Sequence, residues 1–128
     1  MTLEEIRKKH NLSLILMHGS QVGGKTHAKS DTDVAVVRKN NLEKFDFLEL
    51  ISDLGKFLKV DNVDLVDITH ANPLLLFSVA KKSRLLAGTN EDYERLVYLA
   101  FHKYADYQPY LKREADFVKE RIKTYAQS

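Results

Sequence analysis

Two aspartates separated by one residue, Asp31 and Asp33, stand at the start of an apolar run that continues to Val37. If this run is a strand, the two carboxylates share one face and lie roughly 6.6 Å apart along it. A later apolar segment carries two more aspartates, Asp64 and Asp67. Carboxylates gathered at one point raise one another's pKa unless a divalent cation neutralises them, and Mg²⁺ prefers carboxylate oxygens as ligands. The pattern therefore predicts a magnesium site built from three aspartates.

A phosphate-binding turn is predicted upstream of these aspartates. Gly19 and Ser20 follow the apolar segment Leu12–Met17. They can begin a short helix whose free N–H groups and Ser20 hydroxyl face a phosphate, because helix N-termini leave donors unpaired and carry partial positive charge. Lys25 or Lys29 could add positive charge there. Phosphate donors and metal ligands would then border one cleft, which predicts a site for a metal-bound nucleotide.

The same glycines also fit a different nucleotide-binding motif. Residues Gly19–Thr26 satisfy the Walker A pattern of P-loop proteins, with Lys25 as its lysine and Val63–Asp67 as a possible Walker B strand. A P-loop needs a long helix directly after this motif. Only residues 27–32 precede the strand predicted from Asp33, and the chain is short for a P-loop sheet. A small P-loop-like nucleotide-binding protein is therefore the less favoured alternative.

Composition limits the class of protein. The chain has 128 residues, 44% of them apolar, which is enough for one domain over residues 1–128 with its own core. It contains no cysteine, which fits a reducing cytoplasm, and no run long enough to span a membrane or to serve as a signal peptide. Its 20 basic and 18 acidic residues are interspersed, which argues against direct nucleic-acid binding. We expect a cytoplasmic protein.

Predicted strands and helices alternate, which is typical of an α/β fold with helices packed on a sheet. Asn40-Asn41 can cap the first long helix, and Asn72-Pro73 can open the second, since proline is tolerated in a first turn. A shorter amphipathic helix is predicted in residues 1–10, and the fold core runs from about residue 12 to 88. The predicted strands are Leu12–Met17, Asp33–Val37, Val60 or Val63 to Ile68, and Ser83–Ala87; the two longer helices are Leu42–Leu58 and Leu74–Lys82.

The C-terminal part, about residues 90–128, is predicted to be helical. Thr89-Asn90 can cap a helix that runs to about Asp106. Pro109 then interrupts, so the following helix is either a separate segment or the far side of a kink. All six tyrosines lie between Tyr93 and Tyr125. They either pack into the protein's own core or form a docking surface for another protein, and both interpretations stay open.

The spacing of the site residues resembles that of a known family. Gly19-Ser20 is followed after ten residues by Asp31-x-Asp33, with Gly24 and Ser30 between them. This arrangement resembles the signature of the DNA polymerase beta-like nucleotidyltransferases, and within them the minimal nucleotidyltransferases (MNT), the antitoxin partners of HEPN-domain toxins. The resemblance covers about residues 12–88. It implies an α/β nucleotidyltransferase fold with a small mixed sheet of about four strands, flanking helices and a helical C-terminal tail.

The resemblance also implies a set of site residues. The family places a third aspartate on a later strand, and its valine-aspartate-leucine-valine pattern favours Asp64 over Asp67, which would point to the opposite face because strand side chains alternate. His18, directly before the glycine, departs from the apolar or aromatic residue usual there, and could touch the nucleotide without being catalytic. The implied catalytic and metal ligands are Asp31, Asp33 and Asp64, and the implied nucleotide-binding residues are Gly19, Ser20, Gly24 and Ser30.

The implied reaction is magnesium-dependent transfer of AMP from ATP. Two Mg²⁺ ions would bridge the triphosphate, and Asp64 would help to activate an acceptor hydroxyl that attacks the α-phosphorus and releases pyrophosphate. The acceptor implied by the resemblance is a tyrosine on a HEPN ribonuclease toxin, which the modification would neutralise. The alternative is a non-catalytic antitoxin that neutralises by binding and occlusion. A complete set of three aspartates weighs against an idle site, because clustered carboxylates are unfavourable without a function.

Overall fold

Four strands form one mixed sheet in the computed structural model, which describes residues 1–19, 31–40 and 44–127. The sheet order is β3-β2-β1-β4, with β1 antiparallel to both β2 and β4 and with β2 parallel to β3. The predicted mixed four-stranded sheet is therefore confirmed. The strands are β1 (Leu12–His18), β2 (Thr32–Arg38), β3 (Val63–Asp67) and β4 (Ser83–Ala87).

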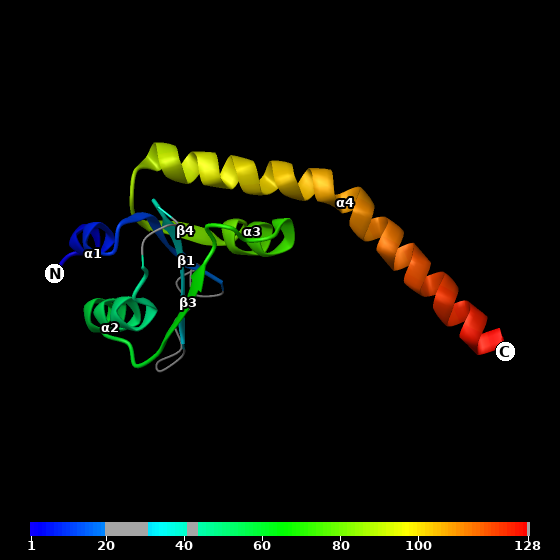
Figure 1. Ribbon diagram of the computed structural model, residues 1–128, viewed down its shortest axis with the longest axis horizontal. Helices are drawn as coiled ribbons and strands as arrows, with labels where there is room; N and C mark the ends of the chain where they lie inside the picture. Colours follow the sequence, from blue (N-terminus) through cyan, green and yellow to red (C-terminus); the bar gives the residue numbers. More distant parts are fainter. Residues whose placement is uncertain (20–30, 41–43, 128) are drawn as a thin grey trace.

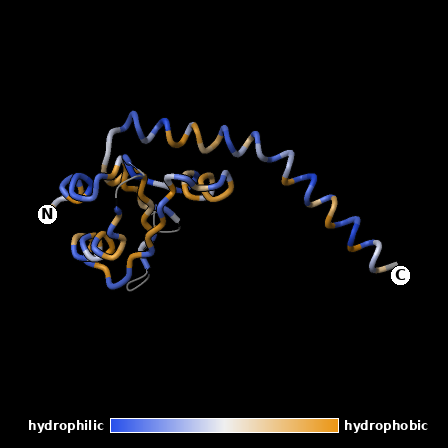
Figure 2. The backbone as a smooth tube through the Cα atoms, viewed as in Figure 1, coloured by the Kyte–Doolittle hydropathy of each residue, from blue (hydrophilic) through white to orange (hydrophobic). Residues whose placement is uncertain are grey.

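Helices cover both faces of this sheet (Figure 1). The helices α1 (Leu3–Lys9) and α2 (Phe47–Leu58) pack on one face, and α3 (Pro73–Ala80) and α4 (Asn90–Gln127) pack on the other. Strand alternation divides the core accordingly, since Val34 and Val36 belong to the first cluster and Ala35 to the second. Figure 2 shows the apolar segments concentrated in the sheet and in the helices against it, whereas apolar and polar turns alternate along α4.

Helix α2 begins later than the sequence pattern predicts. It starts at Phe47 instead of Leu42, and Asp46 is its N-cap, with a carboxylate that accepts a hydrogen bond from the Glu49 N–H at 3.0 Å. The predicted cap at Asn40-Asn41 is wrong for Asn40, which lies outside the helix, whereas residue 41 falls outside the described part of the chain. Aspartate is a strong N-cap residue, so the helix starts where this side chain satisfies its first free N–H.

Helix α3 opens as predicted and closes earlier. Asn72 is its N-cap, accepting from the Leu75 N–H at 2.9 Å, and Pro73 occupies its first turn. The helix ends at Ala80 instead of Lys82. The Lys82 carbonyl is used elsewhere, because it accepts a hydrogen bond from the Gly19 N–H at 3.0 Å at the end of β1. The predicted strand β4 then follows with the predicted bounds.

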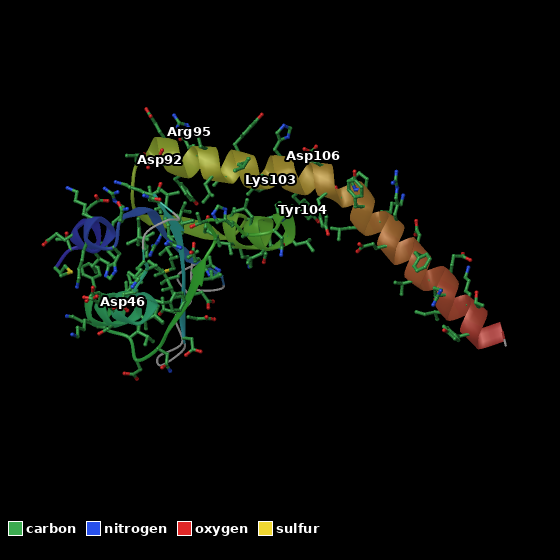
Figure 3. The ribbon with its side chains drawn as sticks, in the orientation of Figure 1. Asp46, Asp92, Arg95, Lys103, Tyr104 and Asp106 are labelled. Carbon is green, nitrogen blue, oxygen red and sulfur yellow. The ribbon has the colours of Figure 1, made fainter. Side chains whose placement is uncertain are left out.

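Helix α4 is one helix of 38 residues that contains Pro109. Its start is capped by Thr89, whose hydroxyl accepts from the Asp92 N–H at 3.1 Å. Of the two alternatives for Pro109, a separate helix is therefore wrong, and α4 bends part-way along its length, just beyond the labelled Asp106 (Figures 1 and 3). Proline bends a helix because it removes one hydrogen bond and clashes with the preceding turn. Beyond the bend, α4 runs away from the sheet.

Among the described residues, no helix combines the length and the apolar content that crossing a bilayer demands.

Candidate functional site

A row of four polar residues crosses the whole sheet, one from each strand. In the strand registers His18 lies opposite Ser83, and Asp33 lies opposite Asp64. Met17 lies opposite Val34, so the same antiparallel register, continued by one residue, sets His18 across from Asp33. Directly opposed residues share one face of a sheet, with Cβ atoms about 4.5–5.5 Å apart. The polar row, defined as Ser83, His18, Asp33 and Asp64, therefore runs along the face that α3 and α4 cover.

The local sequence explains why Asp33 and Asp64 meet. Both stand in the second position of their strands, and β2 and β3 run parallel, so the two side chains lie at the same end of the sheet. The Thr32 N–H donates to the Asn62 carbonyl at 3.1 Å and fixes the register just before the pair. Thr32 is buried, Asp33 is half-buried and Asp31, directly before the strand, is exposed.

Gly19 brings backbone against the Asp33 carboxylate. Its φ is +85°, and a Cβ added to it would lie 2.7 Å from Asp33 Oδ2. Only glycine meets both conditions without strain, because other residues rarely adopt a positive φ and would also collide with the carboxylate. Gly19, which the sequence predicts in the nucleotide site, thus lies beside the predicted ligand Asp33.

Electrostatic repulsion is concentrated on Asp33. Burial raises the pKa of the Asp33 carboxyl above its ordinary value, and the neighbouring carboxylates of Asp64 and Asp31 raise the pKa further, whereas His18 lowers it. A half-buried carboxylate with two acidic neighbours is stabilised by any cation that binds between them. The three predicted aspartates therefore interact electrostatically in the folded chain.

Asp67 has a different role from Asp64. It lies on the opposite face of β3, and its Oδ1 accepts hydrogen bonds from the N–H and the hydroxyl of Thr69. Its Oδ2 lies 3.8 Å from Arg38 Nη1. These contacts link the end of β3 to β2. Asp64, rather than Asp67, is the aspartate opposite Asp33 in the register of the two strands.

Asp33 and Asp64 form a pair of carboxylates of the kind that binds Mg²⁺ together with a nucleotide. Across residues 1–19, 31–40 and 44–127, no three His, Asp or Glu side chains form a group that could hold a metal ion. Mg²⁺ is commonly bound through one or two carboxylates, with substrate phosphates and water completing its coordination. Asp33 and Asp64 provide such a pair, with backbone at Gly19 close beside it.

Several predicted site elements fall outside the described residues. They are Ser20, Gly24 and Ser30, the short helix expected to begin at Gly19-Ser20, the lysines Lys25 and Lys29, and most of the Walker A pattern.

Sequence reasoning missed Ser83 in the polar row, and it singled out His18 only as a residue that could touch the nucleotide. Ser83 Oγ contacts the Ala80 carbonyl at 2.8 Å and Tyr93 Oη at 2.7 Å, and Tyr93 Oη donates to the Ser83 carbonyl at 3.0 Å. These bonds anchor α4 to the end of β4 that carries the row. No short motif could reveal this link, because the serine, the histidine and the aspartates are distant in sequence and only the strand order unites them.

The tyrosines of α4 divide between the two interpretations left open by the sequence. Tyr104 stacks on Phe77 of α3 with ring centroids 3.9 Å apart, and Figure 3 shows it on the side of α4 that faces α3. Tyr93 also packs against the core. By contrast Tyr98, Tyr110 and Tyr125 are exposed. Tyr93 and Tyr104 therefore pack against the rest of the protein, whereas Tyr98 in the first part of α4, and Tyr110 and Tyr125 beyond Pro109, lie at the surface.

Comparison with known proteins agrees with this geometry. The sequence pattern of the family described as "Polymerase beta, Nucleotidyltransferase" matches residues 2–92. A curated relative, "Protein adenylyltransferase MntA" of Shewanella oneidensis, is 37% identical over 83 residues, which are 65% of this chain. The match spans 59% of that relative, less than two thirds of its length.

Solved structures share the fold. The chain is similar to one in a crystal structure of a toxin-antitoxin with AMP-PNP, with a TM-score of 0.73 and 30% identity, covering 90% of this chain and 94% of the other. It is also similar to a chain in the structure of a tri-AMPylated Shewanella oneidensis HEPN toxin in complex with an MNT antitoxin. There the TM-score is 0.67 and the identity 27%, over 90% of this chain and 91% of the other.

Proposed function

Because the chain belongs to the polymerase beta nucleotidyltransferase family, we propose that it is a magnesium-dependent protein adenylyltransferase that acts as an antitoxin. It transfers AMP from ATP to a tyrosine of a HEPN ribonuclease toxin. One observation carries the proposal: Asp33 lies opposite Asp64 on parallel strands, with the Gly19 backbone against the Asp33 carboxylate. The relatives named as a protein adenylyltransferase and as an MNT antitoxin with an AMPylated HEPN toxin support the reaction and the partner.

Each predicted residue has a distinct task in this proposal. Asp31, Asp33 and Asp64 would hold Mg²⁺, as two ions, only together with the phosphates of ATP, since within the described part of the chain the side chains alone do not form a complete metal site. Asp64 would also accept the proton of the acceptor hydroxyl. The oxygen of that hydroxyl bonds to the α-phosphorus of ATP as the bond to the pyrophosphate leaving group breaks. When bound, Mg²⁺ supplies positive charge that stabilises the entering and leaving oxygens. The nucleotide phosphates are held by Gly19, Ser20, Gly24 and Ser30.

The alternative is neutralisation by occlusion, in which the antitoxin blocks the toxin without modifying it. The observation that favours catalysis concerns the surroundings of Asp33. Asp64 and Asp31 lie near it and raise its pKa further, although burial already raises that pKa. A binding protein gains nothing from that repulsion, whereas a metal-dependent enzyme uses it to attract its cation.

The P-loop alternative is disfavoured by topology. The strand that follows the Walker A pattern is β2, which begins at Thr32 and runs antiparallel to β1. Only residues 27–31 separate the motif from that strand, too few for the long helix that a P-loop requires. A P-loop protein would lose activity selectively on Lys25→Ala and would release inorganic phosphate instead of pyrophosphate.

The test is transfer of label from α-labelled ATP to the cognate toxin in the presence of Mg²⁺. We expect wild type and Asp61→Asn, an exposed aspartate in the turn before β3, to transfer label at similar rates. The double variant Asp31→Asn, Asp33→Asn should transfer none and should no longer protect cells from the toxin. Full protection by the double variant would establish occlusion instead.

The proposed function also implies where the protein acts and how its domain is organised. The reaction requires ATP and a ribonuclease toxin as partner, so the protein acts in the cytoplasm. Residues 1–128 form one nucleotidyltransferase domain. Within it, the hydrogen bond from the Tyr93 hydroxyl to the Ser83 carbonyl links α4 to strand β4 of the sheet.

A further inference from the structure

His18 holds a buried hydrogen-bonding atom that has no partner. Its Nε2 is shielded from solvent and, among the residues that the structure describes, is the buried side-chain nitrogen or oxygen for which no hydrogen bond is found. A buried donor left unpaired destabilises a protein by about 1–3 kcal/mol, so native structures keep few of them and each calls for an explanation. The position of this atom within the polar row suggests one.

The two neighbours of His18 in the polar row differ in their ability to accept a hydrogen bond from its side chain. On β4, Ser83 already has two partners for its hydroxyl, the Ala80 carbonyl at 2.8 Å and Tyr93 Oη at 2.7 Å. On β2, Asp33 lies across from His18 by the register of the two strands, and the two side chains interact electrostatically. Of these two neighbours in the polar row, Asp33 is therefore the one whose carboxylate can accept a hydrogen bond from the imidazole.

We propose that His18 is a positioning residue, whose Nε2–H donates a hydrogen bond to the Asp33 carboxylate when the magnesium–nucleotide complex binds and holds that carboxylate in its metal-ligating orientation. This inference rests on the proposed magnesium–ATP site. Carboxylates that bind metals are themselves held by hydrogen bonds from outside the coordination sphere, and loss of such a partner commonly weakens metal binding about 10–100-fold. The Gly19 backbone confines Asp33 on one side, and His18 would fix the carboxylate on another.

The unpaired state then has a simple meaning. The buried Nε2 has no hydrogen-bond partner in the described part of the chain, and the metal-ligating orientation of the Asp33 carboxylate would provide one. Replacing His18 with an apolar ring should accordingly weaken metal binding without reducing the stability of the free protein.

The experiment compares three variants of the full chain. His18→Phe keeps a ring and removes the donor, His18→Gln keeps a donor, and His70→Phe changes an exposed histidine in the turn after β3, at the other end of that strand from Asp64. The affinity for Mn²⁺ in the presence of a non-hydrolysable ATP analogue is measured by electron paramagnetic resonance of free Mn²⁺. Melting temperatures without ligand, and kcat and KM for ATP, are measured in parallel.

We expect His18→Phe to bind Mn²⁺ about tenfold more weakly, and His18→Gln and His70→Phe to bind within about threefold of wild type. The melting temperature of His18→Phe should equal or exceed that of wild type. Should that variant melt lower, His18→Leu takes its place in the same comparison. Unchanged Mn²⁺ affinity in the apolar variant, or an equal loss in His18→Gln, overturns the inference alone. Failure of wild type to bind Mn²⁺ with the analogue overturns both the inference and the proposed function.

Discussion

Asp33 and Asp64 face the same side of the sheet from directly opposed positions on two parallel strands. Their spacing in sequence, 31 residues, is bridged by α2, so the register of β2 and β3 alone decides that the two carboxylates meet. A shift of one residue in either strand would turn one carboxylate to the opposite face of the sheet. The register of β2 and β3 is therefore a condition of the proposed chemistry.

Removing the charge of Asp33 should stabilise the protein without ligand. Because burial and the neighbouring carboxylates raise the pKa of Asp33, the folded state disfavours its ionised form. The contribution of such a group to stability is complete below the pKa of the unfolded chain and is lost as the pH rises through the raised pKa of the folded state. We expect Asp33→Asn to melt roughly 2 °C above wild type at about pH 7 and level with it at about pH 4 in calorimetry without metal. A lower melting temperature at neutral pH would contradict this account.

Gly19→Ala should damage both fold and activity. The new Cβ would lie 2.7 Å from Asp33 Oδ2 on a backbone with φ of +85°. We expect a loss of about 1–2 kcal/mol in the free energy of unfolding and at least about tenfold slower AMP transfer. The matched control is Gly55→Ala in α2, where a Cβ would meet its nearest atom at 3.6 Å. That change should stabilise the protein by about 0.5–1 kcal/mol in urea unfolding, and equal effects of the two changes would refute the argument.

Asp53→Asn should loosen the contact between α1 and α2. The Oδ2 atom of Asp53 lies 2.8 Å from Lys9 Nζ and 2.8 Å from His10 Nε2, and these partners lower the pKa of Asp53. The stabilisation is therefore present above the ordinary pKa and is lost as the pH falls through the lowered one. We expect the variant to melt roughly 3 °C below wild type at neutral pH, with the difference vanishing in acid.

The control for Asp53 is Glu49→Gln, which removes a second carboxylate from the same lysine. Glu49 Oε1 lies 2.9 Å from Lys9 Nζ, but the glutamate side chain is 48% exposed, against 14% for Asp53. Solvent screens such a pair, so the melting temperature should hardly change. A larger effect from Glu49 than from Asp53 would show that the α1–α2 contact does not depend on burial.

The far part of α4 should carry affinity for the toxin. Val118 and Ile122 lie one helical turn apart and are 53% and 61% exposed, and an exposed apolar stripe on a helix suits a groove of a partner. We expect Val118→Ala with Ile122→Ala to weaken toxin binding by about tenfold or more in calorimetric titration, without lowering the melting temperature. The control Glu120→Ala changes an exposed residue about 160° around the helix from both Val118 and Ile122, and an equal loss there would argue against this surface.

The sequence predicts the four strands well, because apolar runs such as Leu12–Met17 must be buried. The short spacing from Gly19-Ser20 to Asp31-x-Asp33 names these aspartates as site residues, and that assignment stays a prediction. The partners of His18 could not be predicted, because Ser83 is 65 residues away and meets it only through the order of the strands. The choice between Asp64 and Asp67 likewise needed the register, since each is compatible with a strand.

Helix boundaries were less predictable, because local capping competes with apolar periodicity. Phe45 lies in register with the apolar residues of the helix, so the pattern places the start of the helix before Phe45. In the structure Phe45 packs against the core although it precedes α2, and the helix begins after its N-cap, Asp46. At Pro109 a sequence rule alone could not choose between a break and a bend. Strong helix formers lie near it on both sides, such as Gln108 and Leu111, and α4 continues with one bend.

The length of α4 sets a requirement for whatever the protein modifies. At 1.5 Å per residue, its 38 residues trace a path of about 57 Å, and its second part points away from the sheet. In the proposed function, a toxin bound at Ile122 would lie along this second part of α4, away from the sheet that carries the polar row. The bound toxin would then be either one elongated protein or an assembly of two subunits, one that binds α4 and one that receives AMP.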